Sequence, residues 1–293
     1  MIKKAQNHPE TKKANLNTEQ MCEWYEISRQ SYYQQSKRER RREAENQQVV
    51  EMVQGIRQRH PRMGTRKLLV KLEPAFKETG IQIGRDRLFD LLAQYDLLVP
   101  RSRKKHRTTW PGKWRCENLL KDLEVTHTQQ AWVCDITYLE TETVFCYLSL
   151  VTDAHSRFIV GYDVSESLAV EGAMRALNMA IRHAKHPLNG LIHHSDHGIQ
   201  YTCHAYRQRL GTFQIQSSMG EVGNCYDNAM AERVNGILKS EYLLGQRFVD
   251  TKQAMQATRQ AIHLYNYERP HLSLAFKTPC EVHASSSLAS ITA

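Results

Sequence analysis

The sequence predicts an α/β protein with a mixed five-stranded sheet flanked by helices, preceded by a basic all-helical region. Three runs rich in β-branched and aromatic residues follow one another between residues 131 and 165, as expected for neighbouring strands. Helix-like and strand-like segments then alternate, which is typical of a sheet covered by helices. Residues 1–116 instead show helical patterns and carry 26 Lys and Arg against 13 Asp and Glu.

The length of 293 residues suits two or three domains, and 41% apolar residues are enough for a sizeable core. The longest nearly apolar stretch, residues 144–151, is too short to span a membrane, and the polar N-terminus lacks the apolar run of a signal peptide. We therefore expect a cytoplasmic protein. Seven cysteines, an odd number without a C-x-x-C pair, predict reduced thiols rather than a disulfide framework.

The net charge of +9 is unevenly spread along the chain, because residues 117–293 carry 14 Lys and Arg against 18 Asp and Glu. A basic region of this length is the electrostatic footprint of a nucleic-acid binder, and a solvated basic surface is the alternative. The patterns divide the chain into four segments: a helix-turn-helix-like segment (1–44), a helical DNA-binding domain (45–98), a basic linker (99–125) and the α/β domain (126–285).

Two short helices are predicted in the first segment. Asn17 or Thr18 can cap a helix over residues 19–26, and Ser28 can cap a second over residues 31–35. Two short helices with a tight break between them resemble a helix-turn-helix. The charged stretch that follows is predicted to be a helix or a linker.

Three further helices are predicted in the second segment. The first ends near His60-Pro61, the second is capped by Thr65 and ends near Pro74, and the third covers residues 84–97. Arg and Lys on their outer faces fit a small DNA-binding unit, and a plain helical bundle is the alternative.

Two prolines, a glycine and a dense basic run mark the segment from residue 99 to 116 as a linker that lies on phosphates. The basic residues expected to contact DNA there are Arg101, Arg103, Lys104, Lys105 and Arg107.

The α/β domain begins with three strands that are expected to form an antiparallel meander. If the first and fourth strands are neighbours, acids on both emerge at one edge of the sheet. The predicted elements, in order, are strands at 131–139, 143–153 and 157–165, a helix at 169–185, a strand at 191–196, a helix at 204–210, a strand at 213–218, and helices at 227–244 and 251–267.

Three acids occupy unusual places in this order. Asp135 lies inside the apolar first strand, Asp196 ends the fourth strand, and Glu232 lies in the first turns of the helix after the fifth. A carboxylate in such a strand costs free energy unless it is paired, and three that converge repel one another. Two Mg²⁺ or Mn²⁺ ions are the natural counter-charge, because these cations prefer oxygen ligands. The alternative for a single acid is a cap or turn residue, which we predict for Asp153 and Asp227.

Thirty-five residues separate Asp196 from Glu232, which is the D,D-35-E spacing of retroviral integrases and many bacterial transposases. The chain resembles, over nearly its whole length, the second-reading-frame product of insertion-sequence-three family transposases, whose core is RNase H-like. Ile199 and the segment 219–221 depart from the family's usual residues and bear on contacts with the DNA end. The matching segments are W-V-C-D-I-T-Y (132–138), V-T-D-A-H-S-R (151–157), H-S-D-H-G-I-Q-Y (194–201), G-N-C-Y-D-N-A-M-A-E (223–232) and Y-N-x-x-R-P-H (265–271).

The resemblance implies two-metal phosphoryl transfer, in which Asp135 bridges two ions and Asp196 and Glu232 each hold one. Water nicks the element's end, and the freed 3′-hydroxyl attacks a second strand without a covalent protein–DNA intermediate. Lys239 and Asn235 lie on the face of the helix that carries Glu232, so we expect both to contact DNA. A surface lysine is the alternative for Lys239.

His194 matches the family motif and is expected near the active site, in contact with DNA. Four histidines surround Asp196, which raises the alternative of a zinc site, but His193 and His194 are successive strand residues and point to opposite faces. We therefore favour carboxylate-bound Mg²⁺ or Mn²⁺ over zinc.

The implied partners are double-stranded DNA, namely the element's terminal inverted repeats and the target, and further copies of the chain assembled on that DNA. The first-reading-frame protein of the family is a further expected partner. Two other functions stay open: a catalytically silent regulator that binds DNA, and an RNase H-type nuclease that cuts without joining.

Overall fold

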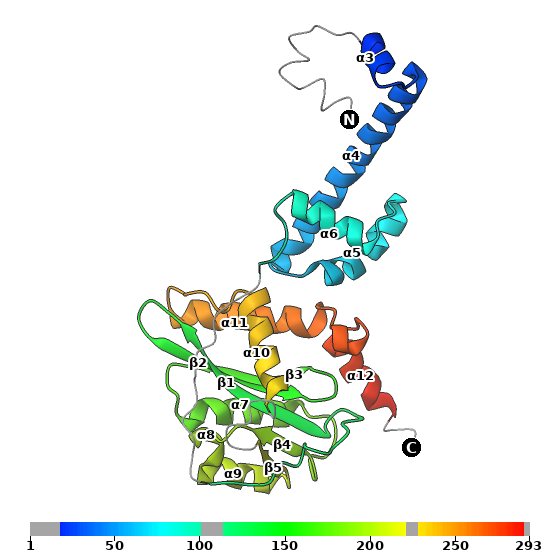
Figure 1. Cartoon of the computed structure of the whole chain (residues 1–293). Helices are drawn as coiled ribbons and strands as arrows, with labels where there is room; N and C mark the ends of the chain where they lie inside the picture. Colours follow the sequence, from blue (N-terminus) through cyan, green and yellow to red (C-terminus); the bar gives the residue numbers. More distant parts are fainter. Residues whose placement is uncertain (1–17, 101–113, 221–227, 290–293) are drawn as a thin grey trace.

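The structure is a computed structural model that describes residues 18–100, 114–220 and 228–289. It consists of a helical unit and a larger core built on a β-sheet (Figure 1). Among the described helices, none combines the length and the apolar character that a membrane crossing requires.

The helical unit begins with α3 (Thr18–Trp24) and continues with one long helix, α4 (Arg29–Arg59). Ser28 caps α4, since its Oγ accepts a 3.1 Å hydrogen bond from the backbone N–H of Ser31. The predicted cap is confirmed, but the predicted short helix at 31–35 is wrong, because α4 continues without a break. The predicted boundary between residues 44 and 45 therefore falls inside this helix.

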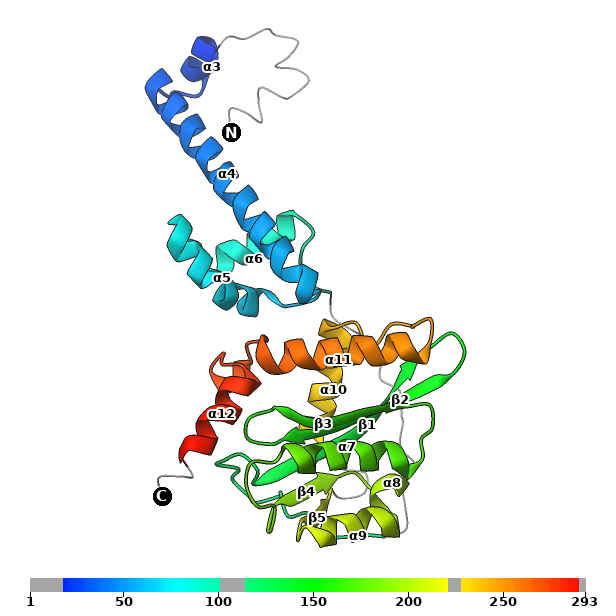
Figure 2. The ribbon, with the colours of Figure 1, turned by 180° about the vertical axis from the view of Figure 1, so that it is seen from behind.

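The residues in the middle of α4 favour a continuous helix. Residues 36–45 are mostly Arg, Lys, Glu and Ala, which are strong helix formers. Arg41 and Glu45 add an ion pair of 3.1 Å one turn apart. The first half of α4, whose described side chains are exposed or only partly buried, extends away from the core in both views and carries α3 at its end (Figures 1 and 2).

The second half of α4 packs on α5 (Thr65–Thr79) and α6 (Arg85–Gln94). Thr65 is the first residue of α5 rather than its cap, and the helix runs past Pro74 to Gly80, whose φ is 69°. Burial of Leu72 and Phe76 on either side of Pro74 offsets the hydrogen bond that proline cannot donate. The buried apolar side chains of the unit are Val49, Val50, Val53, Met63, Leu68, Leu72, Phe76, Ile81, Leu88, Leu91 and Leu92.

The core sheet has five strands in the order β3-β2-β1-β4-β5. The first three form an antiparallel meander, while β4 lies parallel to β1 and β5 lies parallel to β4. The predicted mixed sheet is confirmed, and its first and fourth strands are neighbours, which is the condition for Asp135 and Asp196 to lie close together. The strands are β1 (Ala131–Glu140), β2 (Phe145–Asp153), β3 (Ile159–Ser165), β4 (Ile192–Ser195) and β5 (Gln216–Met219).

Helices cover both faces of the sheet, as Figure 1 shows. Alternate strand residues separate the two sides: Leu150 packs with α10 and α11, whereas Val151 packs with α7 and α9. The remaining elements are α7 (Val170–His183), α8 (Ile199–Thr202), α9 (His204–Thr212), α10 (Ala229–Glu241), α11 (Thr251–Tyr267), η1 (Leu272–Leu274) and α12 (Pro279–Ala289).

A close approach joins β3 to α7. A Cβ atom on Gly161 would lie 2.2 Å from the carbonyl oxygen of Ala176 and 2.8 Å from the backbone nitrogen of Ala180. Glycine is therefore required here by space, since Ala176 and Ala180 bring the helix backbone against the strand. On the opposite face, Asn266 holds α11 on β3 through hydrogen bonds of 2.9 and 3.1 Å with both backbone groups of Ile159.

Residues 114–125, predicted to end the basic linker, pack on the core. Trp114 and Cys116 join the apolar cluster under α7 and α9. The backbone N–H of Leu119 donates a 2.9 Å hydrogen bond to Oγ of Ser218 in β5. The described part of the predicted linker is thus an additional layer on the edge of the sheet.

Candidate active site

The pairing of β1 with β4 aligns two of the predicted carboxylates. Val133 is opposite His194 in this parallel pair, so the same register continued for two residues sets Asp135 opposite Asp196. Neighbouring strands lie about 4.8 Å apart. Asp135 lies in the middle of β1, and Asp196 directly follows the last residue of β4. The register therefore brings the two acids together where the short strand β4 ends beside β1.

Asp135 is held in position by two hydrogen bonds. Its Oδ1 accepts the backbone N–H of Ile136 at 2.9 Å, and its Oδ2 accepts the side-chain amide of Asn235 at 2.7 Å. Burial, reinforced by the negative charge of Asp196, raises the pKa of Asp135 to about 7, against the lowering effect of the two hydrogen bonds. Glu232 adds a smaller raising contribution to the same pKa.

Asp196 begins the turn that follows β4, where its Oδ1 accepts the backbone N–H of Gly198 at 3.0 Å. Glu232 lies exposed in the first turn of α10. Across the described part of the chain, no three His, Cys, Asp or Glu side chains converge closely enough to enclose a metal ion. Asp135, Asp196 and Glu232 thus lie near one another without forming a closed metal-binding site.

The chemistry of this donor set fits a divalent cation. Each oxygen of Asp135 accepts one hydrogen bond, which leaves further lone pairs free to bind a cation. Burial and the negative charge of Asp196 raise the pKa of Asp135, and a bound cation would offset both effects. Carboxylate oxygens are the ligands that Mg²⁺ and Mn²⁺ prefer, so Asp135, Asp196 and Glu232 could hold such an ion.

Lys239 lies two turns beyond Glu232 on α10, and its Nζ is 4.1 Å from the centre of the Tyr138 ring on β1. Burial lowers the pKa of Lys239, and the nearby charge of Asp135 opposes that shift. A half-buried ammonium held on an aromatic ring beside the carboxylates is suited to a phosphate. The DNA contact predicted for Lys239 remains a prediction.

Two other residues predicted to contact DNA have different surroundings. Asn235 is 5% exposed, and its amide is engaged with Asp135. His194 is fully buried, with Nδ1 2.8 Å from Oγ of Ser218 on β5. Asn235 lies on the face of α10 that packs against β1, and His194 is enclosed between β4 and its neighbours in the sheet. In this structure Asn235 supports Asp135, and His194 contacts β5.

The basic linker residues Arg101, Arg103, Lys104, Lys105 and Arg107 lie outside the described residues, as does Asp227. Their predicted roles stay predictions.

Asp153, predicted to be a turn residue, has that role. Its Oδ1 accepts hydrogen bonds of 2.8 Å from both the backbone N–H and the hydroxyl of Ser156, and its Oδ2 accepts the backbone N–H of Gln129 at 2.8 Å. These bonds satisfy a fully buried carboxylate within its own turn.

A buried polar group beneath the carboxylates was not predicted from the sequence. The Nε2 atom of His193 lies 3.0 Å from Sγ of Cys134 and 2.9 Å from the hydroxyl of Tyr206. Burial lowers the pKa of His193 to about 4, so its imidazole is neutral at pH 7. Strand alternation could have indicated this buried group. Cys134 precedes Asp135 and His193 precedes His194, so each points to the opposite face of the sheet from the residue that follows it.

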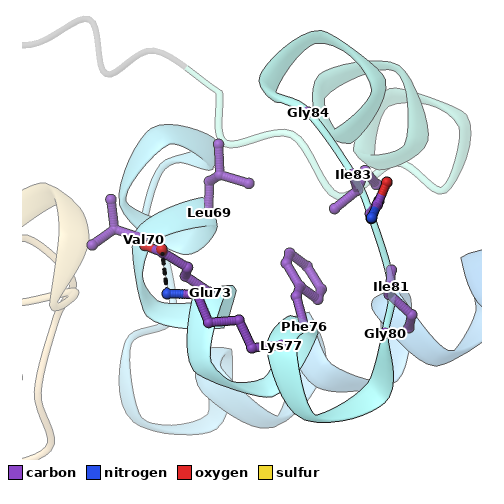
Figure 3. A pocket seen from close by; sticks show the side chains of 10 residues that line it. Leu69, Val70, Glu73, Phe76, Lys77, Gly80, Ile81, Ile83 and Gly84 are labelled. Carbon is purple, nitrogen blue, oxygen red and sulfur yellow. Dashed lines mark ion pairs between the residues drawn. The ribbon is translucent and has the colours of Figure 1, made fainter.

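A pocket in the helical unit is separate from the carboxylates. It has a volume of about 760 Å³ and lies in the helical unit, between α5 and the segment leading into α6 (Figure 3). Apolar side chains such as Phe76 and Ile83 line it, and the exposed pair Lys77 and Glu73 lies beside it. Glu73 is the one carboxylate in its lining, and none of the three acids of the candidate site borders it.

Comparisons with known proteins identify the family of the chain. Residues 125–225 and residues 213–279 each match a family described as Integrase core domain. The chain is 36% identical over 266 residues to an uncharacterized 31 kDa protein of insertion element IS600 from Shigella sonnei, covering 88% of this chain and 96% of the relative. It is 30% identical over 269 residues to a putative transposase of IS986/IS6110 from Mycobacterium tuberculosis, covering 88% and 95%.

Among solved structures, the HTLV-2 integrase catalytic core domain in complex with magnesium is similar at a TM-score of 0.42 and 18% identity. This match covers 53% of the present chain and 96% of that one.

Proposed function

Because the chain belongs to the insertion-sequence-three family of transposases that carry an integrase core domain, we propose that Asp135, Asp196 and Glu232 are its catalytic carboxylates. The chain is a transposase with an RNase H-like core, an enzyme that cleaves DNA and transfers strands during insertion-sequence transposition. The observation that carries the assignment is the β1–β4 register, which sets Asp135 opposite Asp196 under the helix that bears Glu232.

The three carboxylates are proposed to hold two Mg²⁺ or Mn²⁺ ions, with Asp135 shared between them. Such ions, when bound, activate the attacking oxygen and stabilise the leaving oxygen of a phosphodiester. Asn235 orients Asp135 by its hydrogen bond, and Ile136 N–H fixes the other oxygen. Glu232, exposed at the start of α10, turns toward the two aspartates to complete the set.

Two successive displacements at phosphorus account for the activity. In the first, water attacks the phosphodiester at the element's end, and the bond to the 3′ oxygen breaks, which frees a 3′-hydroxyl. In the second, that hydroxyl attacks a phosphodiester of the target, and the target's own 3′ oxygen leaves. Lys239 is proposed to hold a phosphate of the reacting strand through its ammonium group.

The helical unit is proposed to bind the element's terminal inverted repeats. The exposed basic side chains of α4, together with Arg85 at the start of α6, offer contacts to DNA phosphates. We further propose that several copies assemble on the two ends and the target, with the first-reading-frame protein as an additional partner. We also propose that this work takes place in the cytoplasm, at the nucleoid, and the bacterial origin of the relatives supports this.

The decisive experiment is the Asp135→Asn variant, assayed with Mg²⁺ on duplexes that carry the ends of the element. We expect cleavage and joining to be lost while DNA binding persists. Glu142→Gln, which neutralises an exposed carboxylate in the turn after β1, is the matched control and should retain activity. Undiminished cleavage by the Asp135 variant would remove the proposed site.

The same assay separates the three functions that the sequence leaves open. A silent regulator binds the duplex without cutting it, and a simple nuclease cuts it without forming joined products. Addition of EDTA should abolish both products of a metal-dependent transposase and leave binding in place.

A further inference from the structure

The helical unit and the core do not share an apolar interface. In the described part of the chain, the buried apolar cluster of the helical unit draws on residues 49 to 92, and those of the core draw on residues 131 to 265. Apolar packing tolerates small rotations, but here it does not join the two bodies. The described contacts that join them are mainly polar, with one edge contact between the rings of His60 and Tyr242.

A set of polar contacts, here named the interdomain contact, joins the two bodies where α10 and α11 end. In both views the helical unit lies beyond α11, on the side of the core away from α9 (Figures 1 and 2). The interdomain contact consists of Arg59, His60, Arg62, Lys67 and Lys71 in the helical unit and Glu241, Tyr242, Glu268 and Arg269 in the core.

Glu241, the last residue of α10, is the centre of this contact. The Nζ of Lys67 donates to its Oε1 at 2.5 Å, and Arg269 donates to both of its oxygens at 2.9 Å. The backbone carbonyl of Glu241 also accepts the N–H of Arg62 at 3.3 Å. Burial alone would raise the pKa of Glu241, but the neighbouring cations outweigh it and hold that pKa below its usual value.

The Lys67–Glu241 pair is well shielded from water, with side chains 16% and 19% exposed. Such a pair is costly to break, because removal of one partner leaves the charge of the other buried and uncompensated. Around it, His60 lies 3.2 Å from the hydroxyl of Tyr242, and Lys71 donates 3.0 Å to the carbonyl of Glu268. Several directional bonds of this kind define one relative orientation.

The same helix connects this contact to the carboxylates. Glu241 lies nine residues beyond Glu232 on α10, a distance of about 13.5 Å along a rigid helix. Asn235 and Lys239, which adjoin Asp135, lie between them. A displacement of the helical unit relative to α10 is therefore a displacement relative to the reacting atoms.

We propose that Lys67 is a positioning residue, which, through its ion pair with Glu241, fixes the spacing between the DNA sequence gripped by the helical unit and the phosphodiester bond that is cut. This inference rests on the proposed function of the carboxylates and of the helical unit. Lys67 contacts neither metal nor reacting strand. Its effect is on where the enzyme cuts.

The test maps cleavage positions at single-nucleotide resolution for Lys67→Ala, on labelled duplexes that carry the ends of the DNA element encoding this chain. We expect the fraction of cuts at the principal bond to fall on the order of tenfold, because a misplacement of about 1 Å can cost up to about a hundredfold. Nicking of plasmid DNA that lacks these ends, and affinity for the end duplex, should stay near the wild-type values. Lys67→Arg, which keeps the charge, should restore the principal cut.

Lys77→Ala is the matched control, since Lys77 lies on the same helix in an exposed pair with Glu73, at 75% and 61% exposure. It should leave the cleavage map unchanged. If Lys67→Ala does not fold, Lys71→Gln, which removes a single bond to the Glu268 carbonyl, should scatter the cuts to a smaller degree.

A wild-type cleavage map for folded Lys67→Ala, or for Lys71→Gln in its place, would overturn the inference while leaving the proposed function intact. If Asp135→Asn still cleaves, the proposed function fails instead, whatever the map of the Lys67 variant.

Discussion

The side-chain amide of Asn235 donates a 2.7 Å hydrogen bond to Oδ2 of Asp135, and so joins α10 to the first strand at the candidate site. Asn235 is 5% exposed, and its bond, together with that from the backbone N–H of Ile136 to Oδ1, fixes the orientation of the carboxylate. Residues that orient metal-binding groups in this way are often nearly as important as the ligands themselves.

Replacement of Asn235 by Ala should therefore weaken metal use rather than DNA binding. We expect activity or metal affinity to fall by about 10- to 100-fold, because the carboxylate loses its fixed orientation. Cleavage rates measured against Mg²⁺ concentration would reveal the change as a higher half-saturating concentration. Asn178→Ala is the control, since Asn178 accepts a 2.8 Å hydrogen bond from Arg209 in another part of the core. An unaltered Mg²⁺ dependence would contradict the role given to Asn235.

Lys239→Ala tests the phosphate contact. The half-buried ammonium over Tyr138 is expected to neutralise one DNA phosphate, so its loss should weaken binding and reduce the salt slope by about 1. Affinity for the end duplex, measured over a range of salt concentrations, gives both quantities. Lys252→Ala, on the exposed face of α11, should leave the slope as it is. If both variants show the wild-type slope, Lys239 does not bind a phosphate.

The raised pKa of Asp135 predicts how stability depends on pH in the metal-free protein. Its folded-state pKa of about 7 lies above the ordinary 3.8, so the folded state binds more protons between those values. The contribution of Asp135 to stability is therefore favourable at low pH and is lost as pH rises through about 7. Asp135→Asn cannot ionise and should melt a few degrees higher than the wild type at pH 8, on the order of 2–4 °C per kcal/mol.

Thermal melts at pH 5 and pH 8 measure this difference. Mg²⁺ should raise the melting temperature of the wild type at pH 8, because it supplies the missing counter-charge, and should have little effect on Asp135→Asn. Parallel pH profiles for the two proteins would show that the carboxylate is already compensated.

Gly161→Ala should destabilise the core. The added methyl group would lie 2.2 Å from the Ala176 carbonyl oxygen, so α7 must move away from β3, at a cost of roughly 1–3 kcal/mol or more. Gly55→Ala is the matched control, because its Cβ meets nothing within 4 Å and an alanine inside α4 should stabilise by up to about 1 kcal/mol. Denaturant unfolding should shift in opposite directions for the two variants.

Much of the core could be predicted because its strands are short, apolar and bounded by clear breaks. The predicted helix at residues 251–267 matches α11, which Asp250 caps by accepting the N–H of Gln253 at 2.7 Å. β5 begins later than expected, since residues 213–215 complete a turn in which Gln214 has a φ of 54°. Alternation alone cannot distinguish that turn from the start of a strand.

The helical unit was harder to predict for a physical reason. Apolar periodicity reveals a helix by the face that it buries, and residues 29–46 of α4 bury almost none. A polar stretch of good helix formers is equally consistent with a helix and a linker. In α5, the signal from Pro74 predicted an end that burial of Phe76 prevents.

The carboxylates of the candidate site could be found from the sequence because spacing and element order constrain them. Helical spacing also drew attention to Asn235 and Lys239, but the contacts that these residues make could not be found in this way. Tyr138 and Lys239 are 101 positions apart, and Lys67 and Glu241 are 174 apart, so nothing in the sequence pairs them before the chain folds. His194 shows the reverse case, since a family motif gave its neighbourhood correctly but not its burial.

Because α4 is continuous, its length determines the direction in which α3 points around the axis of α4. The helix crosses the boundary predicted between residues 44 and 45 without a break. Therefore α3 and the α5–α6 pair are attached to the same helix, each at a fixed angle around its axis. One residue inserted among positions 36–45 would turn α3 by about 100° and shift it by about 1.5 Å, whereas seven would return it close to its original bearing. Tolerance to inserted length in this rod should therefore be periodic, with the period of the α-helix.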